Sequence, residues 1–432
     1  MKIKFLPVFL FISSFSFIFS LQAQTFELKQ NHPDGLYKSG EKIRFTLIVS
    51  PNTNDSIFLK VKKNNNQTIL KKAIIPEKDT MLVFESSFPE PCAVFIEAKI
   101  KETRKSIGAI VDPLKIKPGL KSPRNLSAYW KKEKQKLADL PFEVNFGKNL
   151  SSAYEVVCFD TELNCTGPKP VRGYFARPTK AAKGSLPVVI LLHAAGVKGS
   201  WCRSDADNAL KMARMGKGAL CFDLNAHGML NGQPDEYYSQ LEEGELKDYY
   251  VQGLESRDDF YFRGMYLRLI RTIDFLTKMP EWDGKRVLVI GESQGGGQAL
   301  AAAGLDSRVS AVVATVPAMC DWGGALDGRK GGWPQPFEKS GNIKKIKKAI
   351  PYYDTANLLK NSKAQILVEI GLIDNTCPAT SIYAAINQAK GEKTIFPVTY
   401  RDHGWPNQEQ RQLDWDKNVN GKKEAFIENY LK

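Results

Sequence analysis

Five short apolar runs after residue 186 limit the folds open to the chain more than any other feature. They do not alternate apolar and polar residues, so each is expected to be buried on both faces, as strands of a parallel sheet are. Between them lie helical stretches such as residues 263–278, where apolar residues recur at helical spacing. This alternation of strand and helix predicts a doubly wound α/β sheet. The five runs are residues 187–192, 218–222, 286–290, 311–316 and 365–370.

The first part of the chain follows a different pattern. Residues 25–118 contain short runs in which apolar and polar residues alternate, separated by turn-forming residues. Several short strands at such spacing predict a small, immunoglobulin-like β-sandwich. Prolines and a glycine then mark a linker, and a second domain is expected over residues 125–432. The clearest alternating runs are residues 43–49, 57–61 and 94–98.

The first 24 residues are interpreted as a signal peptide. Lys2 and Lys4 give a positive start, and residues 5–19 are apolar apart from serines and one proline. This run is shorter than the roughly 20 residues that a membrane helix needs. No later stretch of the sequence is apolar enough to span a bilayer. We therefore expect an exported protein, secreted or periplasmic, without a membrane span.

Net charge bears on nucleic-acid binding, and cysteine content bears on disulfide bonds. The formal net charge is +14, but the lysines are dispersed and no interleaved aromatic and arginine residues offer a stack for bases. A nucleic-acid partner is therefore not expected. The seven cysteines are too scattered for a disulfide scaffold. Cys158 and Cys165 are close enough in sequence to bridge, and the odd total leaves at least one free thiol.

The sharpest motif is Gly-Glu-Ser-Gln-Gly at residues 291–295, directly after the apolar run at 286–290 and before a helix-forming segment. A serine between glycines on a strand-to-helix turn is typical of a nucleophile elbow. The tight turn leaves little room for side chains beside Ser293, and the helix that begins there offers backbone N–H groups to a developing oxyanion. We predict Ser293 as a catalytic nucleophile, with an ordinary turn serine as the alternative.

A nucleophilic serine needs a base, and the chain has four histidines. In an α/β-hydrolase the triad residues follow the order serine, acid, histidine along the chain. Only His403 follows Ser293, so elimination selects it. Asp374 is the predicted acid, which would orient His403 and stabilise its protonated form. Asp402 is adjacent to His403, where neighbouring side chains diverge, and Asp354 precedes its strand, at the wrong end of the sheet.

A second oxyanion donor normally comes from the loop after an early strand. Residues 191–196 fit, because an apolar run ends there in a turn of small residues. We predict the backbone N–H groups of Ala195 and Gln294 as the oxyanion hole. His193 is interpreted as bracing this loop, with proton transfer as the alternative. The sequence carries no metal-site or cofactor signature, so neither group is expected.

At these residues the catalytic half, from about residue 125 to the end, resembles the acetyl xylan esterase and cephalosporin-C deacetylase family. The resemblance rests on Gly-Glu-Ser-Gln-Gly-Gly at 291–296 and on Gly-Leu-Ile-Asp-Asn-Thr-Cys-Pro at 371–378, followed by Ala-Ala-Ile-Asn at 384–387. A third match is Arg263-Gly264 with the helix that leads to Pro-Glu-Trp-Asp at 280–283. The resemblance implies removal of acetyl groups from short acetylated sugars in a small acyl pocket. The N-terminal sandwich lies outside it.

Three positions depart from the family pattern. Asn-Ala-His-Gly at 225–228 stands where the family usually has Arg-Gly-Gln. Gly404 follows the histidine where a glutamate is usual, and Ala195 takes the position of a tyrosine. None of these is a predicted triad residue. They bear on the shape of the substrate rim and on the ring-like oligomer of some relatives, so a homo-oligomer is left open.

The sequence leaves three hypotheses of function. The favoured one is a serine carboxylesterase that removes O-acetyl groups from carbohydrate, such as acetylated xylo-oligosaccharides, through an acetyl-enzyme. The second is a serine hydrolase of other small esters or of peptides, although peptidases of this fold usually carry a propeller larger than this sandwich. The third is a glycan-binding module with an inert hydrolase domain, against which the complete triad argues. The residues that could stack on sugar, or pack in the core, are Trp201, Trp322, Trp333 and Trp405.

Overall fold

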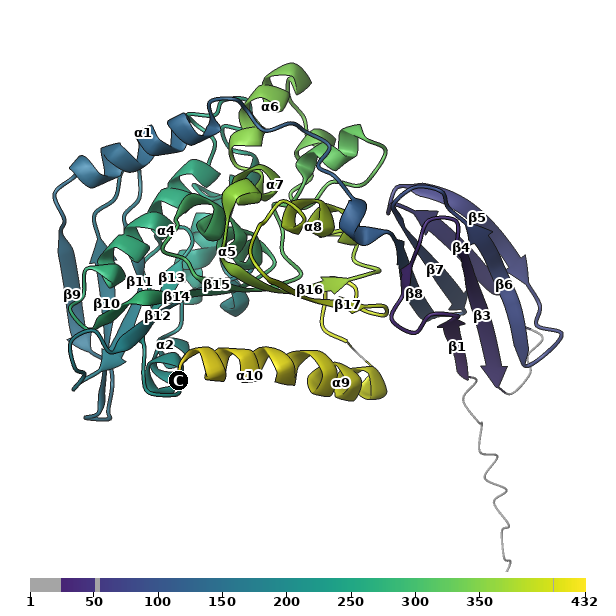
Figure 1. Cartoon of the computed structure of the whole chain (residues 1–432), viewed down its shortest axis with the longest axis horizontal. Coiled ribbons are helices and arrows are strands. Elements are labelled where there is room, and N and C mark those ends of the chain that lie inside the picture. The colour runs from purple at the N-terminus through teal and green to yellow at the C-terminus, as the bar shows by residue number, and fades with distance from the viewer. Residues whose placement is uncertain (1–24, 51–54, 407) are drawn as a thin grey trace, which may run out of the picture.

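The structure is a computed structural model that describes residues 25–50, 55–406 and 408–432. The predicted signal peptide therefore lies outside the described residues. Figure 1 shows a β-sandwich, in purple, beside a larger body in which helices cover both faces of one sheet. In the described part of the chain no helix has both the length and the apolar character needed to cross a membrane.

The β-sandwich is formed by a three-stranded and a five-stranded sheet. Its strands are β1 Thr25–Gln30, β2 Leu36–Tyr37, β3 Lys42–Ser50, β4 Ile57–Lys63, β5 Gln67–Ile74, β6 Thr80–Ser87, β7 Cys92–Ile100 and β8 Thr103–Val111. The strand order is β1-β3-β6 in one sheet and β2-β8-β7-β4-β5 in the other. Alternate side chains of both sheets enter one core, for example Phe45 on β3 and Leu59 on β4, as the two-residue period of a strand requires.

The larger body is built on a nine-stranded sheet, with the order β17-β16-β15-β14-β12-β13-β11-β10-β9. Its strands are β9 Val144–Asn149, β10 Val156–Leu163, β11 Val171–Pro178, β12 Leu186–Leu192, β13 Leu220–Asn225, β14 Trp282–Glu292, β15 Ala311–Thr315, β16 Gln365–Gly371 and β17 Lys393–Val398. The strands β12 to β17 are parallel. The apolar runs in the sequence lie in these strands, and the predicted α/β sheet is confirmed.

One edge of this sheet departs from the strand–helix alternation of a doubly wound sheet. The strands β9, β10 and β11 are antiparallel neighbours. Only residues 164–170 connect β10 to β11. This connection is too short for the crossover that parallel neighbours need. The strand–helix alternation therefore begins after β11, which also pairs antiparallel with β13.

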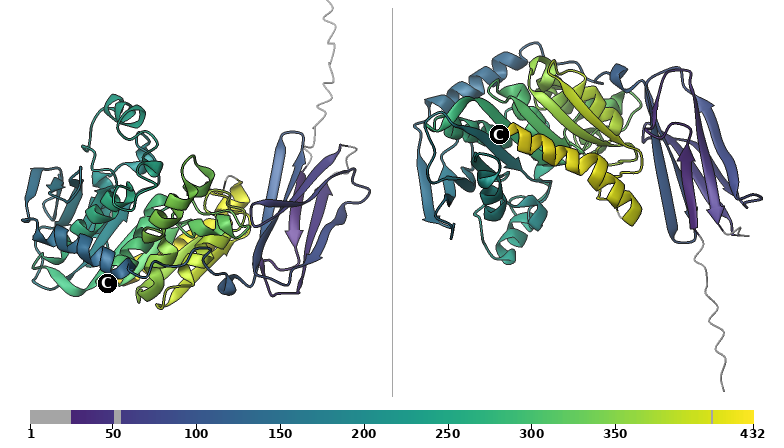
Figure 2. Two further views of the ribbon diagram at one scale, coloured as in Figure 1. Left: turned by 90° about the horizontal axis from the view of Figure 1, so that it is seen from above. Right: turned by 60° about the horizontal axis from the view of Figure 1, so that its bottom comes forward.

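Helices lie on both faces of the sheet. In Figure 1, α1, α4, α5, α7 and α8 lie above the sheet, and α2, α9 and α10 lie below it; Figure 2 shows the same layers from two further directions. The helices are α1 Leu126–Asp139, α2 Ala206–Arg214, α3 Asp235–Glu243, α4 Phe262–Thr277, α5 Gln294–Leu305, α6 Ile343–Ala349, α7 Thr355–Leu358, α8 Ala379–Ile386, α9 Glu409–Trp415 and α10 Gly421–Tyr430. α4 and α5 are buried along most of their length, so the helix after the predicted elbow lies inside the body.

All seven cysteines are free thiols, so the bridge considered between Cys158 and Cys165 is not formed. Cys158 packs in the apolar cluster that includes Ala209 and Leu210 of α2. Cys165 instead packs against the main core, which includes α4. The two thiols thus belong to layers on opposite faces of the sheet, and proximity in sequence does not bring them together.

Candidate active site

The Gly-Glu-Ser-Gln-Gly motif forms a sharp turn between β14 and α5. Ser293 has φ 52° and ψ −115°, a conformation that side-chain-bearing residues rarely adopt. A Cβ on Gly291 would lie 2.3 Å from the backbone of Gly295, and one on Gly295 would lie 2.4 Å from the carbonyl oxygen of Leu192. Both glycines are therefore required by close backbone packing. The turn presents the hydroxyl of Ser293 at the carboxyl edge of the sheet.

The structure brings the three predicted triad residues together from the ends of three parallel strands. His403, beyond β17, places Nε2 2.9 Å from Oγ of Ser293. Its Nδ1 lies 2.8 Å from Oδ2 of Asp374, which follows β16. The other carboxylate oxygen of Asp374 accepts from the backbone N–H groups of Thr376 and Cys377, at 2.7 and 2.8 Å. Asp374 is buried, and these bonds fix its carboxylate against the imidazole.

The electrostatic surroundings favour a basic His403. Burial alone would lower the pKa of its imidazole, since a charged form is poorly solvated there. The hydrogen bond and negative charge of Asp374 outweigh burial, and the pKa of His403 is raised above its ordinary value. Glu292 also raises it, whereas Arg401 lowers it. The arrangement therefore suits an imidazole that takes up a proton from Ser293.

The two acids that the sequence excluded have other contacts. Asp402 is exposed and accepts from the backbone N–H of Gly404. Asp354 caps the N-terminus of α7 by accepting from the backbone N–H of Ala356. Burial, followed by the nearby charge of Asp321, raises the pKa of Asp354 to about 7. Within the described residues neither acid hydrogen bonds to His403, so Asp374 is its carboxylate partner.

Two backbone N–H groups are available beside Ser293. Gln294 is the first residue of α5, so its N–H has no acceptor within the helix. The loop after β12 places Ala195 on the wall of the same cavity. Neither N–H has a hydrogen-bond acceptor among the described residues. An N–H at a helix N-terminus and one on a facing loop form the usual arrangement for binding an oxyanion.

A buried aromatic network holds this loop and the elbow in register. The hydroxyl of Tyr249 donates to Oε1 of Gln294 at 2.5 Å and accepts from the N–H of Gly196 at 3.3 Å. Nε2 of His227 lies 3.0 Å from the carbonyl oxygen of Gly196, and its Nδ1 lies 2.7 Å from the hydroxyl of Tyr261. Burial lowers the pKa of His227 to about 3, so it acts as a neutral donor to the loop.

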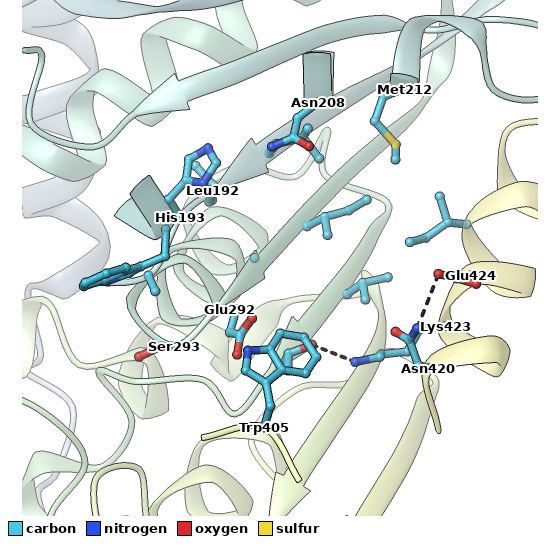
Figure 3. Close-up of a pocket in the computed structure, with 18 of the residues that line it drawn as sticks. Leu192, His193, Asn208, Met212, Glu292, Ser293, Trp405, Asn420, Lys423 and Glu424 are labelled. Carbon is cyan, nitrogen blue, oxygen red and sulfur yellow. Dashed lines mark hydrogen bonds between the residues drawn. The ribbon is translucent and has the colours of Figure 1, made fainter. Parts of the chain in front are cut away.

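A cavity of about 810 Å³ opens onto Ser293 and His403. Three of the four tryptophans singled out in the sequence line it, namely Trp201, Trp333 and Trp405. Trp322 is fully buried and belongs to the core. Figure 3 shows Ser293 and His193 at one end of the cavity and Met212, Asn420 and Glu424 toward the other. The far end is bounded by α2 and α10 and has an apolar floor.

Comparisons with known proteins place the chain in a family. The family model for acetyl xylan esterase (AXE1) matches residues 112–419. The chain belongs to the acetyl xylan esterase family. It is therefore a carbohydrate esterase, and the resemblance seen in the sequence is confirmed. Acetyl esterase Axe7A of Xylanibacter ruminicola is similar to this esterase, with 28% identity over 408 residues that make up 90% of this chain and 89% of that protein.

Solved structures share the fold of the esterase. The acetyl xylan esterase from Paenibacillus sp. R4 has a TM-score of 0.60 and 24% identity. Acetyl xylan esterase 1 from Thermoanaerobacterium sp. JW/SL YS485 has a TM-score of 0.59 and 19% identity. Each comparison covers 74% of this chain and 98% of the other. At these identities the likeness supports the α/β-hydrolase fold.

His193 has a closer relation to the esterase site than the sequence suggested. It was interpreted as a brace for the loop after β12, and its Nε2 does hydrogen bond to Oδ1 of the buried Asp223 on β13. Burial alone would lower the pKa of His193, but the charge of Asp223 and this bond raise it. The ring also lines the cavity beside Ser293. His193 thus both anchors the loop and faces the substrate space.

A buried ion cluster behind the esterase triad was missed by sequence reasoning. Glu369, fully buried on β16, lies 2.9 Å from Nε of Arg401 and 2.6 Å from Nζ of Lys423. It also accepts from the indole N–H of Trp415 at 2.7 Å. Arg401 is two residues before His403, so the cluster anchors the base of that loop. The signal in the sequence was Glu369 itself, a charged residue inside the apolar run at 365–370. A buried charge needs an oppositely charged partner.

Among the described residues, the cluster that could hold a metal ion is the triad region itself, and we do not assign a metal to it. Potential ligand atoms of Asp374, Cys377 and His403 lie within 4.8 Å of one another. Both ring nitrogens of His403 are already engaged, by Ser293 and by Asp374. Asp374 likewise accepts at both carboxylate oxygens. These groups are therefore arranged for proton transfer.

Proposed function

We propose that this esterase removes O-acetyl groups from acetylated xylo-oligosaccharides or related sugars through an acetyl-enzyme on Ser293. One observation carries the proposal, the continuous hydrogen-bonded chain from Oγ of Ser293 through His403 to Asp374 at the mouth of a cavity. Membership of the acetyl xylan esterase family supports the substrate class.

In the first half of the reaction Oγ of Ser293 attacks the acetyl carbonyl carbon while Nε2 of His403 takes its proton. The carbonyl oxygen becomes an oxyanion, which the N–H groups of Gln294 and Ala195 would bind. The bond to the sugar oxygen then breaks, and His403 returns the proton to that oxygen. The sugar leaves with a free hydroxyl, and the acetyl group stays on Ser293.

Water completes the cycle by the same route. It gives a proton to His403 as its oxygen attacks the acetyl-enzyme, and the same N–H groups would bind the second oxyanion. Collapse breaks the bond to Ser293, which recovers its proton from His403, and acetic acid is released as acetate. Asp374 keeps its charge throughout and stabilises the imidazolium in both halves.

The rim of the cavity supports a sugar as the leaving group. Trp201 and Trp405 expose 66% and 54% of their surface, which is unusual for such large apolar side chains. Both line the cavity that contains Ser293. Exposed aromatic faces present an apolar body to the C–H faces of a sugar ring, while polar groups nearby can bind hydroxyls. Trp333 completes the aromatic rim.

We also propose that the enzyme acts outside the cytoplasm, as the apolar N-terminal segment after Lys2 and Lys4 indicates. Polymeric xylan and its larger fragments would meet the enzyme there. Export is tested by the N-terminal residue of the mature protein, which is expected to follow position 23 or 24. An intact Met1 on protein recovered outside the cytoplasm would contradict this.

The test compares acetate release from acetylated xylo-oligosaccharides by the wild type, Ser293→Ala and a control, Ser127→Ala. Ser127 is an exposed serine on α1. We expect release to be lost in Ser293→Ala and unchanged in the control, with p-nitrophenyl acetate preferred over the butyrate. Hydrolysis of nitrophenyl esters without release from the sugar would overturn the sugar assignment. Inactivity on every ester would favour a binding module.

A further inference from the structure

We propose that the β-sandwich is a working part of the esterase site, and that Asn65 is a positioning residue for Asp374. The inference rests on the proposed triad mechanism and adds a role for the N-terminal part of the chain. Its basis is a set of contacts between the sandwich and the two loops that carry the acid and the base. We define the acid loop as residues 371–378 and the base loop as residues 399–404.

Asn65 reaches the acid directly. Its Nδ2 donates to the backbone carbonyl oxygen of Asp374 at 2.8 Å and to Oδ1 of Asn375 at 3.1 Å. The residue lies in the turn between β4 and β5 and has the left-handed conformation, with φ 59°. Only 5% of its surface is exposed. A polar turn residue is normally solvated, so this burial indicates a specific contact.

The turn that carries Asn65 is fixed by hydrogen bonds of the preceding residue, Asn64. The side-chain oxygen of Asn64 accepts from the N–H of Ala93 on β7 at 3.0 Å, and the N–H of Asn64 donates to the Ala93 carbonyl at 2.8 Å. On its other side the carbonyl of Asn64 accepts from the N–H of Lys330 at 3.0 Å. The turn is therefore fixed to the sandwich and to the catalytic body at once, and Asn65 cannot move away from Asp374 freely.

A second strand of the sandwich contacts the base loop. The N–H of Gly108 on β8 donates to the carbonyl oxygen of Thr399 at 2.8 Å. A Cβ on Gly108 would lie 2.5 Å from the carbonyl oxygen of Leu372 in the acid loop. Gly35 packs in the same place, where a Cβ would lie 2.8 Å from side-chain atoms of both Leu372 and Thr399. Glycines thus let the sandwich backbone touch both loops.

Apolar packing excludes water from around these polar contacts. Ala93 and Ile110 of the sandwich are buried in the same core cluster as Leu372 and Cys377 of the acid loop. A hydrogen bond in such surroundings is costly to remove, because the group left behind cannot turn to water. The carbonyl of Asp374 would be left unpaired if Asn65 lost its amide. The acid loop would then relax and move the carboxylate relative to His403.

This role differs from simple domain attachment in a measurable way. The pKa of His403 is raised because its bond to Asp374 outweighs burial. The other ionisable groups around the imidazole are Glu292 on the elbow, Arg401 on its own loop and Cys377 on the acid loop. A misplaced Asp374 lowers the pKa of His403, and the acid limb of the kcat/KM profile then moves to lower pH. A contact that only attaches the sandwich leaves that limb unchanged.

The experiment uses the full chain with Asn65→Asp, Asn65→Gly and the matched control Asn66→Ala. Aspartate keeps the shape and the left-handed backbone but replaces the amide donor with an acceptor. Glycine keeps the backbone freedom and removes the side chain. Asn66 is exposed in the same turn. Rates on p-nitrophenyl acetate are divided by the concentration of active sites, which is titrated with a fluorophosphonate. Unfolded protein then does not lower the apparent kcat.

We expect both Asn65 variants to lose roughly tenfold to a hundredfold in kcat, the range for a displacement of about 1 Å in a catalytic group. KM should change by less than about twofold, and the acid limb should move to lower pH in Asn65→Gly, which adds no charge beside His403. Asn66→Ala should match the wild type. Wild-type kcat in both Asn65 variants and an unshifted acid limb in Asn65→Gly, with Ser293→Ala inactive, would overturn the inference alone. Activity that survives Ser293→Ala would overturn the proposed function and the inference together.

Discussion

Asp374 and Asp402 form a natural pair for testing the acid assignment at the scale of single residues. Asp374→Asn removes the charge that orients and stabilises His403, and we expect kcat to fall about ten-thousandfold, as for a triad acid. Asp402→Asn removes only an exposed charge, since the amide oxygen can still accept from the N–H of Gly404, so a change below about threefold is expected. Steady-state rates on p-nitrophenyl acetate measure both. A small effect of Asp374→Asn would contradict the assignment.

The pH dependence of the reaction also belongs to the residue scale. Only the neutral imidazole can accept the proton of Ser293, so kcat/KM should fall as pH drops through the pKa of His403. That pKa is raised above its ordinary value, with burial opposing and Asp374 prevailing. We therefore expect the acid limb above about pH 6.5, measured with p-nitrophenyl acetate between pH 4 and 9. A midpoint well below that value would show that Asp374 does not support the base.

The triad itself could be predicted because its constraints are local and few. The glycines beside Ser293, the order of residues along an α/β-hydrolase and the small number of histidines left one solution. The residues around it could not be found in the same way. Tyr249 and Asn65 act through backbone groups and through the side-chain amides of Gln294 and Asn375. Such contacts leave no periodic or compositional pattern. His227 was noticed only as a departure from the family pattern.

At the scale of elements, the short helical turn that carries Tyr249 supports both sides of the proposed oxyanion hole. Tyr249→Phe leaves Oε1 of Gln294 and the N–H of Gly196 without their partner. We expect kcat to fall roughly tenfold, less than the 10²–10³-fold that loss of an oxyanion donor costs. Unfolding free energy should fall by about 1–3 kcal/mol, because a buried polar group is left unpaired.

Tyr250→Phe is the matched control for that loop, since its hydroxyl donates to the nearby Asp248. Its kcat should stay within about twofold of the wild type, and urea titration should give the same stability. If Tyr249→Phe and Tyr250→Phe behave alike, packing holds the loop after β12. The hydrogen bonds of Tyr249 then do not contribute to kcat.

The elements that sequence predicted best are those whose burial is uniform. The parallel strands β12, β13, β15 and β16 are buried along nearly their whole length, and their apolar runs are recognisable without knowledge of their neighbours. The edge strands β9 to β11 were harder, because one face is partly exposed and their direction depends on the length of each connection. Strand direction is a property of the whole sheet, and residues 164–170 show it only once the strands on either side are known.

At the scale of the whole molecule, the docking of the sandwich lies beyond sequence reasoning. Asn65 and Asp374 are separated by 309 positions. Nothing in the turn at 64–66 distinguishes an asparagine that is solvated from one that is buried against a second domain. The contacts of Gly108 and Asn65 place the sandwich against the acid and base loops.

The shared core predicts that the esterase unfolds as one cooperative unit. Ala93 and Ile110 of the sandwich pack in the same buried cluster as the catalytic body, so neither part can open without exposing apolar surface of the other.

All seven tryptophans follow residue 125, and their fluorescence therefore reports the catalytic body alone. Far-UV circular dichroism reports both parts. In a urea titration we expect the two signals to share one midpoint, as a two-state transition requires. A dichroism change that precedes the fluorescence change would mean that the sandwich opens first. In that case its contacts with the acid and base loops would be too weak to hold Asp374 against His403.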